Sequence, residues 1–379
     1  MSKINVRSPY FITDNSTGGT NSSSLVSANL SIKIYSGSSS TSMSNAQYLI
    51  SSTAVDGSVT FEVSELVRDY IENSFDGDYT GSVKWFNYTI FRVYENDVPT
   101  TTAVETLSVF DGYGYFEDGA NPQNLQSALQ SNTTIFTNDF ANINIPIHVT
   151  EDTTVSYLKD GEIIFTKDLI YSISNADQVQ YVQNSSLDAD VFKKRVDAIA
   201  DATVEAFNCV KAIANDVYQE FDADSIYIDK GGVIEVIKIE EVEECKYNPY
   251  KVTFVNKFGV LQDLWFFKRS NLSLNTQQES YKANIVTDGT YSINSRQKTV
   301  FNKTGMERLQ LNTGFYPESY NDVFRQLTLS EEVWINYDGD TLPINVMSSS
   351  LNYKTSVNDK LINYTIDVEF ANNKINNIR

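Results

Sequence analysis

The chain has 379 residues, of which 41% are hydrophobic and 21% are charged. This composition is typical of folded domains, and the length predicts two or three of them at roughly 100–200 residues each. Twenty-nine basic and 49 acidic residues give a net charge of -20. That balance argues against sequence-independent binding of nucleic acid, which needs an excess of Lys and Arg facing the phosphates.

The sequence pattern contains no export or membrane signal. Residues 1–11 have no apolar core of a secretory signal, and no stretch approaches the roughly 20 apolar residues of a membrane span. Asn, Ser, Thr and Tyr are abundant, as in proteins that work outside cells. We therefore predict a protein without a membrane span, assembled in a cytoplasm into a particle that later works outside.

The first block, residues 1–125, has the pattern of a β-sandwich with one short helix. Alternation of apolar and polar residues predicts strands at 25–36, 57–63, 81–94 and 102–110. At 64–71 the spacing of apolar residues becomes helical, and Ser64 followed by Glu65 suits a helix start.

The second block, residues 126–185, is again strand-like, and Asp-Gly at 160–161 predicts a hairpin turn. Apolar residues then recur at alternating steps of four and three, which predicts a long amphipathic helix over 186–222. The helix either packs on its own domain or bundles with copies of itself. A seam shorter than about five heptads favours the first reading.

The third block, residues 223–379, has the pattern of a β-domain with one covering helix. We predict a hairpin around 256–259, a helix near 322–330 and a closing pair of strands around 358–359. The fold class predicted for the whole chain is mainly β with α insertions.

Catalytic machinery is scarce in this sequence. His148 is the one histidine and lies in an alternating strand pattern, while Cys209 and Cys245 are too few for a disulfide framework or a zinc site. We predict that both cysteines are reduced, with a single bridge between them as the alternative. The aspartates at 76–78, and those at 222–224 together with Asp229, lack the spacing of a calcium loop and are predicted to occupy turns and caps.

Motifs for nucleophilic catalysis or phosphate binding do not occur either. We therefore predict no catalytic, cofactor-binding or metal-binding residues and no enzymatic activity. A glycosidase that uses two carboxylates is the enzymatic alternative, because so acidic a chain offers many pairs.

Charge is distributed unevenly. Residues 250–379 carry 14 basic and 13 acidic residues, whereas residues 1–249 carry 15 and 36. A near-neutral surface suits burial against neighbours better than an acidic one. We therefore predict that the C-terminal third forms interfaces with other chains, and that Arg325 and the strand containing Tyr364 lie at or near a subunit contact.

Six segments of the sequence are similar to segments found in one group of proteins, namely residues 5–11, 65–70, 111–119, 250–259, 261–268 and 358–365. Together they resemble a group of virion structural proteins from tailed bacteriophages that infect Bacteroidetes-type bacteria. The resemblance extends over both ends of the chain and leaves out the helix predicted at 186–221. It implies a virion component and transfers no catalytic residue.

The resulting expectation is a non-enzymatic structural protein of the virion that packs as multiple copies in a ring. Its partners would be copies of itself and other phage structural proteins, and not nucleic acid. Placement in the tail, baseplate or neck follows from the C-terminal pattern, which is similar to the β-domains that stack in phage tails.

Three alternatives remain open. One is a receptor- or glycan-binding protein on the particle surface, whose partner would be a glycan of the host surface. Another is a head-associated protein, either a capsid decoration or a fibre. The third is a tail-associated glycosidase.

Overall fold

A computed structural model describes residues 3–17, 23–35, 46–79, 84–122, 128–130, 133–138, 143–149, 152–169, 179–183, 223–348 and 361–375. In this part of the chain strands dominate and helices are short, which confirms the mainly-β prediction. The chain divides into two compact units. Unit 1 comprises Met1–Glu243 and Thr253–Leu264, and unit 2 comprises Glu244–Val252 and Trp265–Arg379.

The first part of unit 1 is sandwich-like, with two sheets. The larger sheet has the order β1-β8-β6-β3-β4, with β7 paired to β6. Its strands are β1 (Lys3–Asn5), β3 (Leu25–Tyr35), β4 (Tyr48–Thr53), β6 (Lys84–Tyr94), β7 (Thr100–Thr101) and β8 (Glu105–Phe110). The smaller sheet pairs β2 (Phe11–Asp14) with β5 (Val59–Glu62). The predicted helix is present as α1 (Ser64–Arg68) and directly follows β5.

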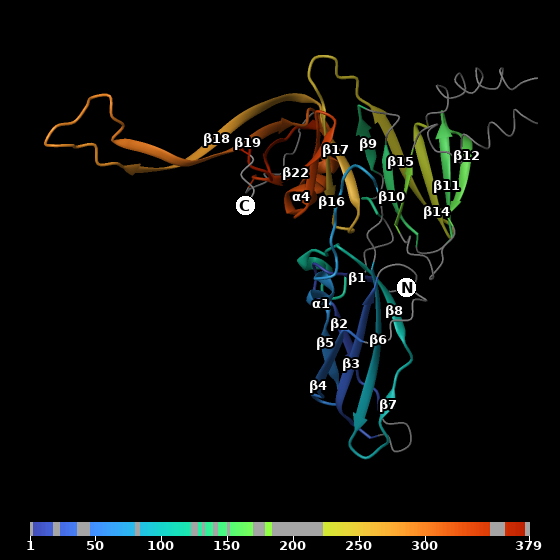
Figure 1. The fold of residues 1–379 in the computed structure, drawn as a ribbon. Coiled ribbons are helices and arrows are strands. Elements are labelled where there is room, and N and C mark those ends of the chain that lie inside the picture. The colour runs from blue at the N-terminus through green and yellow to red at the C-terminus, as the bar shows by residue number, and fades with distance from the viewer. Residues whose placement is uncertain are drawn as a thin grey trace, which may run out of the picture. The chain divides into compact units, whose positions relative to one another are not determined.

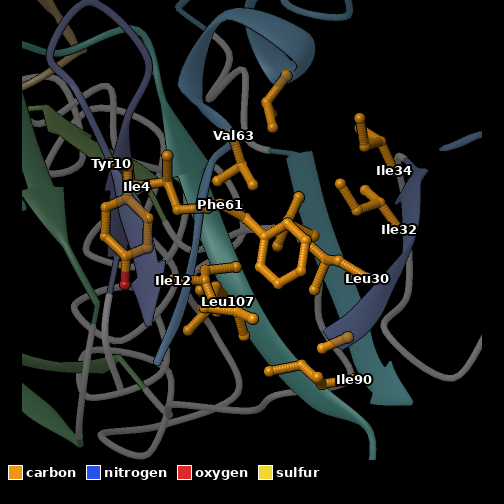
Figure 2. Packing of buried hydrophobic residues seen from close by; sticks show 14 of the residues in the cluster. Ile4, Tyr10, Ile12, Leu30, Ile32, Ile34, Phe61, Val63, Ile90 and Leu107 are labelled. Atoms are coloured by element: carbon orange, nitrogen blue, oxygen red, sulfur yellow. The ribbon is translucent and has the colours of Figure 1, made fainter. Parts of the chain in front are cut away.

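Side chains from both sheets share one core. Leu30 and Ile32 alternate along β3 and are fully buried, and Phe61 on β5 belongs to the same cluster. Figure 2 shows how residues from β1, β2, β3, β5 and β6 gather there. Burying a side chain of this size contributes about 1.5–3 kcal/mol relative to exposing it. The apolar side chains that alternate along the sequence therefore hold these two sheets together by packing in one core.

An ion pair also joins the two sheets. Arg92 on β6 donates from Nε to Oδ2 of Asp14 on β2 (2.5 Å) and from Nη2 to Oδ1 (3.2 Å). The backbone N–H and the hydroxyl of Ser16 donate to the same carboxylate. Burial alone would raise the pKa of the Asp14 carboxyl, but these hydrogen bonds outweigh it and hold the pKa below its ordinary value.

The second part of unit 1 contains a five-stranded sheet in the order β12-β11-β14-β15-β9. Its strands are β9 (Thr134–Thr137), β11 (Thr153–Lys159), β12 (Glu162–Leu169), β14 (Ser225–Lys230) and β15 (Val233–Glu241). A further pair joins β10 (Asn144–His148) to β13 (Val179–Gln183). The predicted hairpin turn is confirmed between β11 and β12, where Asp160 and Gly161 both have positive φ.

The boundary between the second and third blocks differs from the prediction. The sequence pattern placed it at 223, but β14 pairs with β11 and β15 pairs with β14. Residues 223–243 therefore complete the sheet of the second block, because their alternating apolar face covers the same core. The helix predicted at 186–222 lies outside the described residues.

A tight turn at 256–260 packs within unit 1 and confirms the predicted hairpin between β16 (Tyr250–Val255) and β17 (Leu261–Phe266). Asn256 is fully buried and its Oδ1 accepts hydrogen bonds from two backbone N–H groups of the turn. A Cβ atom on Gly112 would lie 2.8 Å from the carbonyl oxygen of Lys257. The close approach of the two backbones therefore requires glycine at this position.

The main sheet of unit 2 has the order β17-β16-β21-β22-β24-β19-β18, although Thr253–Leu264 of β16 and β17 belong to unit 1. Its other strands are β18 (Lys268–Lys282), β19 (Lys298–Asn312), β21 (Val333–Tyr337), β22 (Asp340–Val346) and β24 (Thr365–Phe370). A short pair joins β20 (Tyr316–Pro317) to β23 (Leu361–Ile362).

The covering helix of unit 2 is confirmed as α4 (Asn321–Leu329), which follows a 3₁₀ turn at Glu318–Tyr320. The Phe324 ring on its inner face is fully buried and contacts Tyr316 and Tyr364. The partners of β24 differ from the predicted closing hairpin. It pairs with β19 and β22, and residues 349–360, which include the predicted turn, lie outside the described part.

We expect Asp14→Asn to lower the free energy of unfolding by about 1–3 kcal/mol at pH 7, because charge-assisted hydrogen bonds are lost. The folded-state pKa of Asp14 is depressed, so this stability is present above the unfolded pKa of about 3.9 and is lost as pH falls through the folded pKa. Urea unfolding at pH 7 and at pH 3 measures both values, and the difference from wild type should shrink at pH 3.

The matched control is Glu105→Gln, which neutralises an exposed carboxylate on β8 of the same sandwich. It should change stability by less than about 0.5 kcal/mol at either pH. An Asp14→Asn difference that is the same at pH 7 and pH 3 would contradict the role given to the charged pair.

Candidate functional site

The most unusual feature of the described chain is a long hairpin, residues 268–312, which we call the arm. It consists of β18, β19 and the loop between them, and each strand has 15 residues. At about 3.3 Å per residue such strands are roughly 50 Å long. In Figure 1 the arm (orange) leaves the other strands of unit 2 and ends in a loop.

The arm exposes both of its faces along its outer part, whereas Leu309 and Leu311 at the base of β19 are buried. Every residue from 271 to 282 is exposed, and so are residues 300–303 on the opposite strand. A sheet strand in a packed domain normally buries at least one face. Because a lone two-stranded ribbon is at best marginally stable in water, the arm has the properties of a segment that becomes covered by a partner.

The loop at the end of the arm contains a tight turn with exposed apolar side chains around it. Asp288 and Gly289 both have positive φ and form a turn closed by a bridge between Thr287 and Thr290. Three large apolar side chains are exposed around this turn, namely Val286 (54%), Tyr291 (65%) and Ile293 (92%). Exposed apolar residues grouped at a loop tip are typical of contact surfaces.

The register of the hairpin gives its two faces different chemistry. Leu272 lies opposite Leu309 near the base, and Lys282 lies opposite Lys298 near the tip. A bulge at Asn302, where φ is 49°, shifts the register between these two pairs. Alternation along β18 places both pairs on one face, which we call the lysine face.

The other face of the arm carries aromatic residues near the tip. Tyr281 and Phe301 are about half exposed, and their rings meet edge to face at 5.8 Å between centroids. Such a pair makes a rigid amphipathic surface at low cost in side-chain entropy.

The arm is basic, unlike the rest of the chain. It carries seven basic and three acidic residues, a net charge of +4. Unit 1 carries 15 basic and 36 acidic residues, a net charge of -21. The arm is therefore electrostatically complementary to most of the surface that another copy of this chain would present.

Ion pairs fix the base of the arm to the rest of unit 2. Arg308 donates from Nε to Glu369 on β24 (2.6 Å), and Lys374 pairs with Glu307 (3.0 Å). Another pair links Lys268, the first residue of the arm, to Glu244 (2.5 Å). The hydrogen bond from Lys268 lowers the pKa of the Glu244 carboxyl. Lys268 and Arg308 at the base of the arm are thus paired with carboxylates. Near the tip, Lys282 and Lys298 have no carboxylate partner among the described residues.

The residues predicted to lie near a subunit contact have internal roles in unit 2. Tyr364 is 4% exposed, packs on Phe324 and donates its hydroxyl hydrogen to Oδ1 of Asn321. Arg325 on α4 pairs with Asp322 one turn earlier. The Tyr364 side chain is thus part of the core, and a subunit contact near these two residues stays a prediction.

The other residues that were considered as catalytic or metal-binding candidates make structural contacts. His148 is buried, and its Nε2–H donates to the carbonyl oxygen of Phe258 (3.2 Å) while its ring meets the edge of Phe110. Asp76 and Asp229 each accept a backbone N–H within a turn, as predicted for turn aspartates. No group of three or more potential metal ligands occurs among the described residues.

Cys245 is an exposed thiol, and Cys209 lies outside the described residues. Within the part of the chain that the structure covers, no helix combines the length and apolar character required to cross a bilayer.

Sequence reasoning did not predict the arm. Asn, Ser, Thr and Gln make up about half of β18 and a third of β19, and along the outer part of the arm no buried face gives a strong period of two. The usable signal was the excess of Lys and Arg over residues 268–312 within an acidic chain.

Comparison with protein-family models, with curated proteins and with solved structures finds no match to this chain.

Because neither face of the arm is covered in the single chain, we expect its backbone amides between residues 277 and 302 to exchange with solvent readily in the monomer. Amides of β24, which is paired on both sides, should exchange at least about a hundredfold more slowly. Hydrogen–deuterium exchange of the dilute protein, read by mass spectrometry, measures both. Equal protection of the arm and β24 would show that the arm is stable without a partner.

Proposed function

We propose that this protein is a non-enzymatic structural component of a tailed-phage virion, in the tail, baseplate or neck, which assembles as multiple copies in a ring. The observation that carries the proposal is the arm, a roughly 50 Å ribbon whose outer part is largely exposed on both faces in the single chain. Ring subunits need a surface on one copy that fits a different surface on the next, and a projecting arm provides one.

Three further features support this proposal. The arm is basic and unit 1 is strongly acidic, so copies attract one another head to tail rather than through the same patch. The base of the arm is fixed by ion pairs, which suits a rigid connector. Six sequence segments resemble virion structural proteins, which favours a virion as the assembly that contains the ring.

A second candidate function is attachment to a glycan on the host surface. It is favoured by one observation, the pair Tyr281 and Phe301 near the tip together with the exposed Tyr291. Aromatic rings of this kind stack on sugar faces. Binding of host-surface polysaccharide that is lost in Tyr281→Ala/Phe301→Ala, in a chain that does not self-associate, would favour this candidate over the ring.

We expect self-association of the full chain to depend on the arm. Residues 275–306 can be replaced by Asn-Gly, which joins the directly opposed residues Leu274 and Glu307 through a two-residue hairpin turn. This shortened chain should keep the core of unit 2 but remain monomeric at concentrations where wild type forms multimers. Sedimentation velocity over a concentration series gives the masses of both proteins.

The shortened chain must be shown to fold, and its thermal unfolding should stay within a few degrees of wild type, because the deleted residues bury little. Multimers of the shortened chain equal to those of wild type would contradict the role of the arm. A wild-type chain that stays monomeric at every concentration would contradict the ring itself.

A further inference from the structure

Two lysines near the end of the arm face each other across the strands. Lys282 and Lys298 are directly opposed in the register, and both are exposed. Neither has an ion-pair partner among the described residues. Like charges at directly opposed positions destabilise a two-stranded ribbon. An anionic partner that binds both ammonium groups would remove this repulsion.

A complementary pair of unpaired carboxylates lies at the end of β15 in unit 1. Glu241 and Glu243 are exposed and alternate with the half-buried Val242, so their side chains lie on one side of an extended segment. In the described part of the chain neither glutamate has a basic partner. Residues i and i+2 of a strand are about 7 Å apart and opposed residues about 5 Å, so the two pairs have similar spacing.

The two pairs cannot meet within one chain. Glu244, next to Glu243, is bound to Lys268 at the base of the arm. Lys282 is 14 residues further along β18, which at about 3.3 Å per residue is roughly 45 Å from that base. A contact between the lysine pair and the glutamate pair therefore requires two copies.

We propose that Lys282 and Lys298 of one copy bind Glu241 and Glu243 of a second copy, so that the arm of each subunit ends at the base of the next subunit's arm. This inference rests on the proposed ring and names the surface that each arm meets. The contact joins two different patches and is therefore heterologous, which is the kind that closes into a ring or continues as a filament.

Charge favours a second copy of this chain over other anions. The chain outside the arm carries 22 basic and 46 acidic residues, a net charge of -24. A nucleic acid or an anionic membrane has no basic segment that offsets its repulsion by that remaining charge, whereas a second copy brings a basic arm of its own together with its acidic surface. Both of these polyanions can be distinguished from a second copy by the experiment below.

The test is a charge swap in the full chain, read by sedimentation velocity at 50 and 300 mM NaCl. We expect K282E/K298E and E241K/E243K each to raise the dissociation constant of self-association about tenfold at 50 mM, the order expected when two partly screened ion pairs are lost. The quadruple variant should associate nearly as wild type does. Wild-type association should weaken at 300 mM, where exposed charges are screened.

The matched control is R68E/K159E, which makes the same change in net charge at exposed basic residues on α1 and β11, elements that carry neither pair. It should leave self-association within about threefold of wild type, because a change in net charge alone acts only through screened long-range forces. Thermal unfolding of every variant separates a lost contact from a lost fold.

Other results overturn the inference in distinguishable ways. If the arm-shortened chain loses association but K282E/K298E retains it, the ring stands and the lysine–glutamate contact is wrong. A quadruple variant that fails to recover overturns the assignment to Glu241 and Glu243. Loss of binding to a labelled DNA duplex or to anionic vesicles in K282E/K298E, with self-association unchanged, assigns the lysines to another partner. A monomeric wild type overturns both proposals.

Discussion

The constraint on which this account depends is that a two-stranded ribbon exposed on both faces gains little from folding by itself. The strands of the arm pair with each other along one edge only, so the outward-facing N–H and C=O groups of its outer part depend on solvent, and β18 buries no side chain between residues 271 and 282. In the other large sheets that the structure describes, one face covers a hydrophobic core, as is usual in β-proteins. The arm departs from this rule. A partner molecule that covers its exposed faces would explain the departure.

How much of this fold the sequence predicts depends on where its apolar side chains are buried. Alternation identified β3 and β24 because Leu30, Ile32, Ile366 and Val368 all face a core. Helical spacing identified α4 through Phe324 and Leu327 in the same way. Long-range pairing was not predictable from these patterns, so residues 223–243 were assigned to the wrong block although β14 pairs with β11.

The candidate site was missed for the opposite reason. The arm has no buried face, so its strands lack the periodicity that reveals a strand, and only its charge distinguishes it. The prediction that residues 250–379 supply the intermolecular surface followed from that charge averaged over the whole third. The structure concentrates the basic excess in the arm, whereas Tyr364, chosen for its strand pattern, is a core residue.

A reconstruction by electron cryomicroscopy of the multimer that the wild-type chain forms shows directly whether a second copy covers the arm. We predict that both faces of the arm become less exposed in the multimer and that the end of the arm contacts the end of β15 in the adjacent copy. A multimer in which the arm remains surrounded by solvent, with subunits joined through other surfaces, would contradict this prediction.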